Sequence, residues 1–69
     1  MESAPTISVI IPTYNRKHSL QRTLDSLRSQ TFPRERFVVI VVDDDSTDGT
    51  PTVANEHFPF AFVYARQKH

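Results

Sequence analysis

The feature that most constrains this chain is an apolar run that ends in a block of acids. Residues 38–42 read VVIVV, and Asp43, Asp44 and Asp45 follow them directly. A strand without polar alternation is typically buried on both faces, as in a parallel sheet covered by helices. Adjacent carboxylates repel one another, and burying an unpaired carboxylate is costly. The acids are therefore expected at the rim of the sheet, outside its core.

Hydrophobic patterns divide the rest of the chain into alternating strands and helices. They predict strands at residues 6–11, 36–42 and 60–65 and helices at residues 18–30 and 51–57. Strands that alternate with helices indicate a parallel α/β sheet in the order β-α-β-α-β. The predicted fold class is therefore α/β.

Each predicted element has an expected buried side. The first helix presents a stripe of Leu20, Leu24 and Leu27, with Asn15 or Ser19 as its N-cap. In the second helix, Thr50 is the expected cap and Pro51 lies in the first turn. Two further sets share faces: Val53 and Ala54 point inward from that helix, and Phe60, Phe62 and Tyr64 form one side of the last strand.

Two polar loops follow the first two strands. The loop PTYN occupies residues 12–15, and the loop DDDSTDG occupies residues 43–49. In open α/β sheets, ligands bind beyond the carboxyl ends of the strands. If the two strands are neighbours, both loops line one cleft, and the carboxylates lie at its rim.

Composition narrows the classes of partner. The chain has 69 residues, no cysteine, and eight basic against eight acidic side chains. Because these charges balance, no net electrostatic field attracts the chain to nucleic acid. No segment approaches the roughly 20 apolar residues that a membrane span needs. Residues 1–12 are acidic first and apolar later, unlike a signal peptide. The expectation is a cytoplasmic protein, with membrane association left open for a longer form.

Several readings of the acidic loop compete. Asp48 and Gly49 suit a strand-to-helix turn. Asp44, Ser46 and Asp48 have the spacing of a calcium loop, but a strand precedes them and residue 55 is Asn. A phosphohydrolase or a receiver domain would use Asp43–Asp45 at a magnesium site, but both usually place this strand first in the domain.

Three motifs in order carry a resemblance to a known family. They read SVIIPTYNR at residues 8–16, LQRTLDSLRSQTFP at residues 20–33 and VIVVDDDSTDGT at residues 39–50. Together they resemble the start of an inverting family 2-type glycosyltransferase. The resemblance implies the Rossmann-like nucleotide-binding half of a GT-A domain, and residues 1–69 would be an incomplete, N-terminal portion of it.

The resemblance also implies roles for individual residues. Pro12 and Tyr14 would flank the base, and Asp44 would accept a hydrogen bond from a base N–H. Thr13, Asn15 and Ser46 would contact the ribose or hold the loops, and Arg16 would approach the diphosphate. The loop-structuring residues would be Asp43, Asp48 and Gly49.

Residue 45 departs from the family pattern. The family usually has glycine there, where a positive φ is free of steric strain, whereas aspartate tolerates that region only moderately. The extra carboxylate also disfavours a nearby diphosphate unless a metal or a basic residue intervenes. We therefore expect Asp45→Gly to be neutral or stabilising.

The catalytic base and the metal-binding D-x-D of the family are expected downstream of this chain. No catalytic residue and no metal ligand is thus assigned within it, and His18, His57 and His69 match no family base. The implied partners are UDP-, GDP- or dTDP-linked sugars, with Mg²⁺ or Mn²⁺ in the full-length enzyme. The isolated chain is predicted to be inactive and to self-associate through an exposed sheet edge and apolar patch. A non-catalytic α/β binding module is the alternative.

Overall fold

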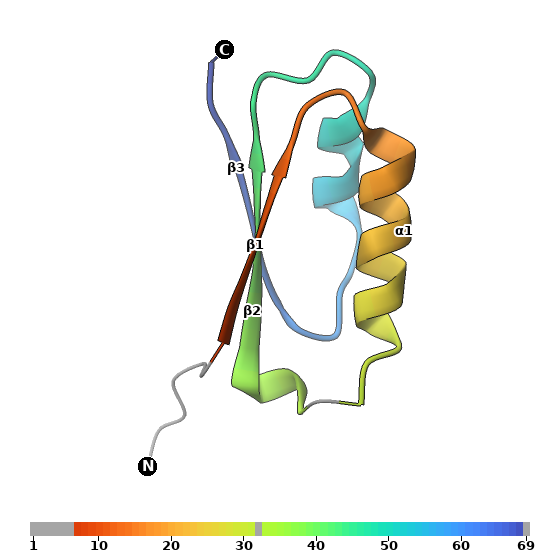
Figure 1. The fold of residues 1–69 in the computed structure, drawn as a ribbon, viewed down its shortest axis with the longest axis vertical. Helices are drawn as coiled ribbons and strands as arrows, with labels where there is room; N and C mark the ends of the chain where they lie inside the picture. The colour runs from red at the N-terminus through yellow and green to blue at the C-terminus, as the bar shows by residue number, and fades with distance from the viewer. Residues whose placement is uncertain (1–6, 32, 69) are drawn as a thin grey trace.

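The computed structural model describes residues 7–31 and 33–68 and confirms the α/β class (Figure 1). Three strands alternate with helical segments, as the sequence pattern predicts. Thr6, in the first predicted strand, and His69 lie outside the described residues. The elements in chain order are β1 (Ile7–Thr13), α1 (Lys17–Arg28), the short 3₁₀ helix η1 (Arg34–Arg36), β2 (Phe37–Asp43), the 3₁₀ helix η2 (Thr50–Asn55) and β3 (Ala61–Arg66).

The three strands form one parallel sheet in the order β1-β2-β3. Ile10 pairs with Ile40, and Ile40 pairs with Val63, so the strands run in register across the sheet. All three carboxyl ends therefore lie at the same edge, at the top of Figure 1. The loops after β1 and β2 both leave from this edge.

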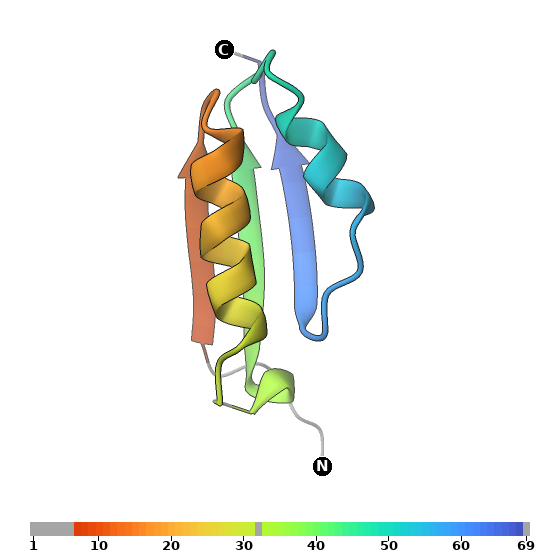
Figure 2. The same ribbon diagram turned by 90° about the vertical axis from the view of Figure 1, so that its right-hand side faces the viewer.

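The helices α1 and η2 cover the same face of the sheet. Figures 1 and 2 show α1 and η2 side by side in front of that face. The leucine stripe packs there as predicted, with Leu20 and Leu24 buried and Leu27 half-buried against them. The buried apolar core consists of Leu20, Leu24, Phe37, Val39, Val41, Val53 and Phe60.

The prediction that β2 is buried on both faces is wrong for the described residues. Along Phe37–Asp43, fully buried side chains alternate with half-buried ones. The reason is that α1 and η2 lie on one side only, so the opposite face is left open. Ile10 and Val63 on that face are 63% and 48% exposed. The expected apolar patch is therefore present, while self-association stays a prediction.

Several boundaries differ from the predicted ones. β1 continues through Pro12, because β1 is an edge strand, where a residue without an N–H is tolerated. α1 runs from Lys17 to Arg28, and neither Asn15 nor Ser19 is its N-cap; Arg16 holds that position without a side-chain cap bond.

The segment before β3 also differs from its prediction. η2 is a 3₁₀ helix that ends at Asn55 rather than an α-helix to residue 57, and its N-cap is Gly49 instead of Thr50. Val53 is buried as predicted, but Ala54 is exposed because of the tighter winding. The prediction for Ala54 is therefore wrong.

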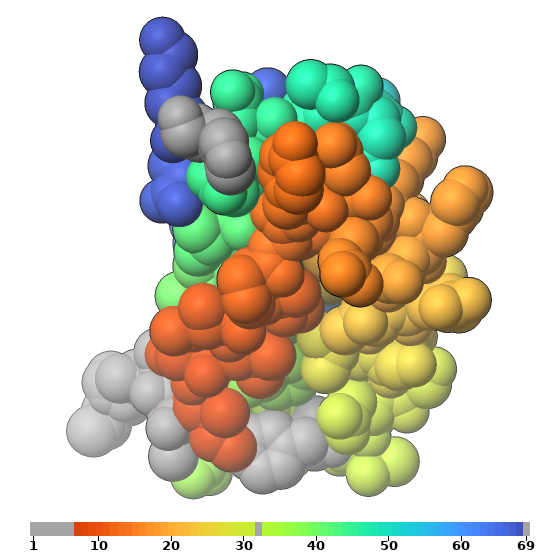
Figure 3. Space-filling view, turned by 45° about the horizontal axis from the view of Figure 1, so that its top comes forward, coloured from red at the N-terminus to blue at the C-terminus, as the bar shows by residue number. Residues whose placement is uncertain are grey.

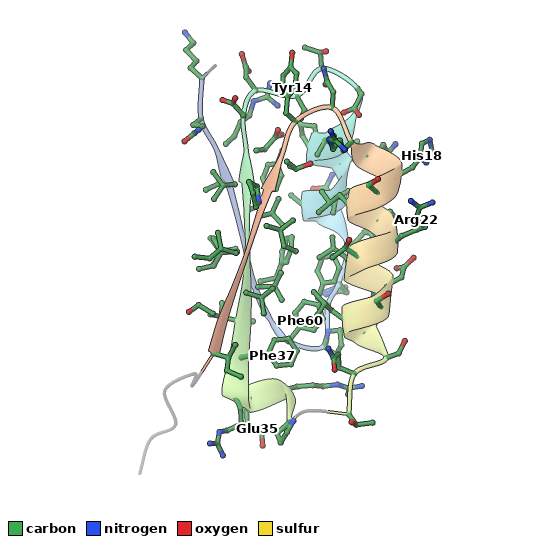
Figure 4. The ribbon with its side chains drawn as sticks, in the orientation of Figure 1. Tyr14, His18, Arg22, Glu35, Phe37 and Phe60 are labelled. Atoms are coloured by element: carbon green, nitrogen blue, oxygen red, sulfur yellow. The ribbon has the colours of Figure 1, made fainter. Side chains whose placement is uncertain are left out.

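Aromatic side chains fill the end of the core that lies away from the two loops. The ring centroids of Phe37 and Phe60 are 5.3 Å apart, and those of Phe58 and Phe62 are 4.3 Å apart. Figure 4 shows Phe37 and Phe60 near the base of the sheet, on the side of the helices. Phe60 precedes β3 instead of belonging to it, but it shares the buried side with Phe62 and Tyr64, as predicted.

Candidate functional site

The loops after β1 and β2 are joined by a set of hydrogen bonds. The amide of Asp44 donates to the carbonyl of Thr13 at 2.9 Å. The amide of Asn15 donates to Ser46 Oγ at 2.8 Å, and the amide of Thr47 donates to Asn15 Oδ1 at 2.7 Å. Figure 3 shows the two loops in contact on the face that comes forward. The convergence of the loops that the topology predicts is thus present.

A hollow of about 370 Å³ lies beside these loops. A volume of this size is within the usual range for small-molecule sites. Five of the seven residues predicted to bind nucleotide line it. The complete lining is Pro12, Thr13, Tyr14, Arg16, Val42, Asp44 and Gln67.

The other two predicted nucleotide-binding residues, Asn15 and Ser46, are not part of this lining. They hold the two loops together instead, and Asn15 adopts a positive φ of 49° to do so. Tyr14 is 48% exposed. Figure 4 shows it at the carboxyl edge of the sheet.

Gln67 is a lining residue that the sequence analysis missed. It follows β3, and its amide donates to the carbonyl of Asp43 at 2.8 Å. The rule that pointed to the loops after β1 and β2 also applies to the residues after the third strand. It could therefore have identified Gln67.

Asp43 is fully buried, so the expectation that all three acids lie at the rim outside the core is wrong for this residue; it structures the acidic loop from within. Its Oδ1 accepts hydrogen bonds from the Ser46 amide at 3.1 Å and from the Ser46 hydroxyl at 2.5 Å. Its Oδ2 accepts from the Tyr64 hydroxyl and lies 3.8 Å from Arg66 Nη1. Burial by itself raises the pKa of Asp43, but the hydrogen bonds from Ser46 and Tyr64, together with Arg66, outweigh it and lower that pKa.

Tyr64 and Arg66 on β3 are further residues that sequence reasoning missed. Burial and the hydrogen bond to Asp43 raise the pKa of the Tyr64 phenol to about 12. Arg66 pairs in register with Asp43, and its Nη2 donates to Asp45 Oδ1 at 2.7 Å. That bond raises the pKa of Arg66 further. The available signal was the alternation along β3, which puts residues 64 and 66 on one face.

Asp48 connects the starts of the two helical segments. Its Oδ2 accepts the Lys17 amide at 3.1 Å, and its Oδ1 accepts the Thr50 amide at 3.1 Å and the Thr50 hydroxyl. The Thr50 hydroxyl is the main reason that the pKa of Asp48 is lowered; the two amides add to it against the effect of burial. Asp48 thus supplies the cap that α1 lacks on its own residues.

Gly49 and Asp45 both adopt the left-handed region. Gly49 has φ 88°, and a Cβ there would lie 3.5 Å from Lys17 Nζ. Asp45 has φ 64°, so the position where the family usually has glycine does require a positive φ. Asp45 is strained in this conformation because it is not glycine, and its carboxylate forms an ion pair with Arg66.

The geometry does not suit the metal-dependent readings of the acidic loop. Among residues 7–31 and 33–68, no group of three His, Cys, Asp or Glu side chains is arranged to hold a metal ion. Asp43, the first of the acids that a phosphohydrolase or a receiver domain would use, is buried with both oxygens engaged. Asp48, at position five of the calcium-loop spacing, accepts hydrogen bonds from the amides of Lys17 and Thr50 instead. A divalent metal thus has no evident site among these residues.

Of the histidines in the described residues, neither His18 nor His57 lines the hollow. His18 is exposed on α1 (Figure 4). His57 is also exposed, and its carbonyl accepts a hydrogen bond from Arg28 Nη1 at 2.8 Å.

Within the described part of the chain, no helix is both long and apolar enough to cross a bilayer.

The comparisons with a family model, with curated relatives and with a solved structure all find glycosyltransferases. AglE, a glycosyltransferase of Haloferax volcanii, is 44% identical over 52 residues, which are 75% of this chain and 17% of that protein. Validoxylamine A glucosyltransferase of Streptomyces hygroscopicus subsp. jinggangensis is 51% identical over 53 residues, 77% of this chain and 13% of that protein. The chain therefore spans less than a fifth of the length of these relatives.

A solved structure extends the likeness to the fold. It is the mannosyltransferase PcManGT from Pyrobaculum calidifontis in complex with GDP-Man and Mn²⁺, with a TM-score of 0.81 and 37% identity over 91% of this chain and 19% of that one. The arrangement is thus a Rossmann-like fragment of a GT-A fold. The family model described as glycosyl transferase family 2 matches residues 8–69. On these grounds, the chain belongs to glycosyl transferase family 2.

Proposed function

We propose that this chain supplies the nucleotide-binding part of an enzyme that transfers a sugar from a nucleotide sugar to an acceptor. The observation that carries the proposal is the hollow at the carboxyl edge, where Tyr14 and Asp44 come from different loops to line one space. Family membership and the GDP-Man complex of the mannosyltransferase support it. The proposal places the catalytic groups of that enzyme outside residues 1–69.

The lining chemistry suits a nucleoside. An aromatic face such as that of Tyr14 stacks on a base with about 1–3 kcal/mol. An ionised carboxylate is an acceptor only, so Asp44 selects bases that present a ring N–H, namely uracil, thymine and guanine. Cytosine and adenine lack that proton in their neutral forms. The proposed donors are therefore UDP-, dTDP- or GDP-linked sugars.

Arg16 and the backbone of the first loop are the proposed contacts of the ribose and diphosphate. Arg16 lines the hollow and carries a permanent positive charge. Arginine matches phosphate oxygens in two-point hydrogen bonds. A divalent metal belongs to the proposal for the whole protein, but we assign none of its ligands to the described residues.

The test is a calorimetric titration of the intact protein, produced from its complete reading frame, with UDP, GDP, dTDP and CDP. We expect at least one of the first three to bind about tenfold more tightly than CDP, because the N3 of cytosine presents a lone pair to Asp44. Asp44→Asn should weaken the preferred nucleotide about tenfold, since the hydrogen bond loses its charge. Equal affinities of the wild type and Asp44→Asn would remove Asp44 from the site.

A second measurement separates an enzyme from a non-catalytic binding module. The intact protein is incubated with the sugar nucleotide of the preferred base, and release of the nucleoside diphosphate is followed with and without candidate acceptors. Release that depends on Asp44 supports a transferase. Tight nucleotide binding without any release would favour the module instead.

A further inference from the structure

Arg66 makes contacts with the acidic loop that the proposed function does not use. Its Nη2 donates to Asp45 Oδ1 at 2.7 Å and to the carbonyl of Ser46 at 3.1 Å. Its Nη1 lies 3.8 Å from the buried Oδ2 of Asp43. One guanidinium at the end of β3 thus reaches three residues of the segment that ends β2 and begins the acidic loop.

This loop needs a cation for two reasons. Asp43, Asp44 and Asp45 are consecutive, so ionisation of all three creates repulsion within the loop. Asp45 also holds a φ of 64°, which an L-residue adopts with some strain. The ion pair with Arg66 offsets the charge of the residue that stands in place of glycine, and it fixes that residue in its left-handed conformation.

The conformation of the loop sets the position of Asp44. The Asp44 amide is bonded to the first loop through Thr13, and Ser46, whose carbonyl Arg66 binds, receives the amide of Asn15. Asp44 itself lines the hollow between the two loops. A shift of the loop at residues 45–46 would therefore move Asp44 relative to Tyr14.

We propose that Arg66 is a positioning residue for nucleotide binding, which acts through Asp45 to keep the acidic loop in the conformation that presents Asp44 to the hollow. This inference rests on the proposed nucleotide-binding function. It makes Asp45 and Arg66 a matched pair: the arginine matters because residue 45 is an aspartate. In a chain with glycine at position 45, most of the need for Arg66 disappears.

The experiment is a double-mutant cycle in the intact protein. The wild type, Arg66→Ala, Asp45→Gly and the double variant are compared for affinity toward UDP and GDP by calorimetry. Amide hydrogen exchange of segments 13–16 and 44–48 is measured on the same four proteins without nucleotide. Arg22→Ala is the matched control, because it removes one arginine from the exposed surface of α1, where Figure 4 shows it pointing away from the sheet.

We expect Arg66→Ala to weaken the preferred nucleotide about fivefold and to speed exchange in both segments by a similar factor. In the Asp45→Gly background, the same substitution should change affinity by about twofold or less. Arg22→Ala should match the wild type in both measurements. An equal loss of affinity in the wild-type and Asp45→Gly backgrounds would overturn the inference, because Arg66 would then act on the nucleotide directly or on stability in general.

The two measurements separate this inference from the proposed function. If the wild type binds none of the nucleotides, the proposed function fails, and hydrogen exchange alone decides the role of Arg66 in the loop. Faster exchange in Arg66→Ala that Asp45→Gly reverses supports the positioning role. Unchanged exchange and unchanged affinity in Arg66→Ala would overturn it.

Discussion

The two ends of the sheet are built from opposite kinds of interaction. At the amino end of β2, Phe37 and Phe60 pack with tilted rings, and Phe58 stacks on Phe60 at 5.4 Å. At the carboxyl end, Asp43 and Asp48 are surrounded by hydrogen-bond donors. Apolar contacts thus hold one end, and directed polar contacts hold the other.

This difference separates stability from placement. Apolar burial is non-directional and large, so it holds the sheet together without fixing single atoms. Hydrogen bonds contribute about 1 kcal/mol each, but they fix the direction of every group they join. The end of the sheet with the hollow is therefore the end where the position of Asp44 is specified by partners rather than by packing.

Removing an aromatic ring is expected to lower the free energy of unfolding most. A small effect would contradict the view that apolar contacts hold this end of the sheet. Phe60 is 7% exposed, so Phe60→Ala should lower the free energy of unfolding by about 3–5 kcal/mol. A domain of this length has a total stability of roughly 3–10 kcal/mol. Urea titrations monitored by circular dichroism should therefore show that the variant is largely unfolded even without urea.

The control for this variant lies on the open face of the sheet. Ile10 is 63% exposed, so Ile10→Ala should lower the free energy of unfolding by less than about 1 kcal/mol. Similar losses for Phe60→Ala and Ile10→Ala would mean that the aromatic end does not dominate stability.

Asp43→Asn tests the polar end and should have an intermediate effect. The amide loses the charge that attracts Arg66 and presents an N–H group where the carboxylate accepts from the Tyr64 hydroxyl, so we expect a loss of about 1–3 kcal/mol at pH 7. The folded-state pKa of Asp43 is lowered, so the stability it contributes is present above its unfolded pKa of about 3.9 and is lost as pH falls through the folded value.

The measurement is the difference in unfolding free energy between the wild type and Asp43→Asn from pH 7 to pH 2. That difference should shrink below about pH 4, because protonation removes the same charge from the wild type. A difference that stays constant over this range would show that the charge of Asp43 contributes nothing and that the polar end depends on shape alone.

The arrangement of the sheet could be predicted from the sequence because it follows from strong, repetitive signals. The apolar run at residues 38–42 identifies a strand, and the leucine stripe identifies α1 together with its buried side. The meeting of the two loops needed only the rule that parallel strands end at one edge. That rule brought Tyr14 and Asp44 to the same hollow.

The contacts of single side chains could not be predicted in the same way. Tyr64 bonds Asp43 across 21 positions in sequence, and Arg66 reaches Asp45 across the same distance. Such pairs depend on the register of β2 with β3, which no local pattern specifies. The cap of α1 was missed for a similar reason, because Asp48 accepts the hydrogen bond of the Lys17 amide from a separate loop.

Tyr64→Phe should have the smallest effect and sharpens the comparison, because it removes one polar contact without changing packing. We expect a loss of about 0.5–1.5 kcal/mol at pH 7, the usual value of one hydrogen bond. The pKa of Tyr64 is raised to about 12 in the folded state, against about 10 in an unfolded chain. The contribution of the phenol is therefore complete below pH 10 and is lost between pH 10 and about 12. Urea unfolding of both proteins at pH 8, 10 and 11.5 checks this: the wild type should converge on Tyr64→Phe as pH rises. A gap of unchanged size at pH 11.5 would mean that the contribution of the hydroxyl does not depend on its proton, so that the hydrogen bond to Asp43 is not its source.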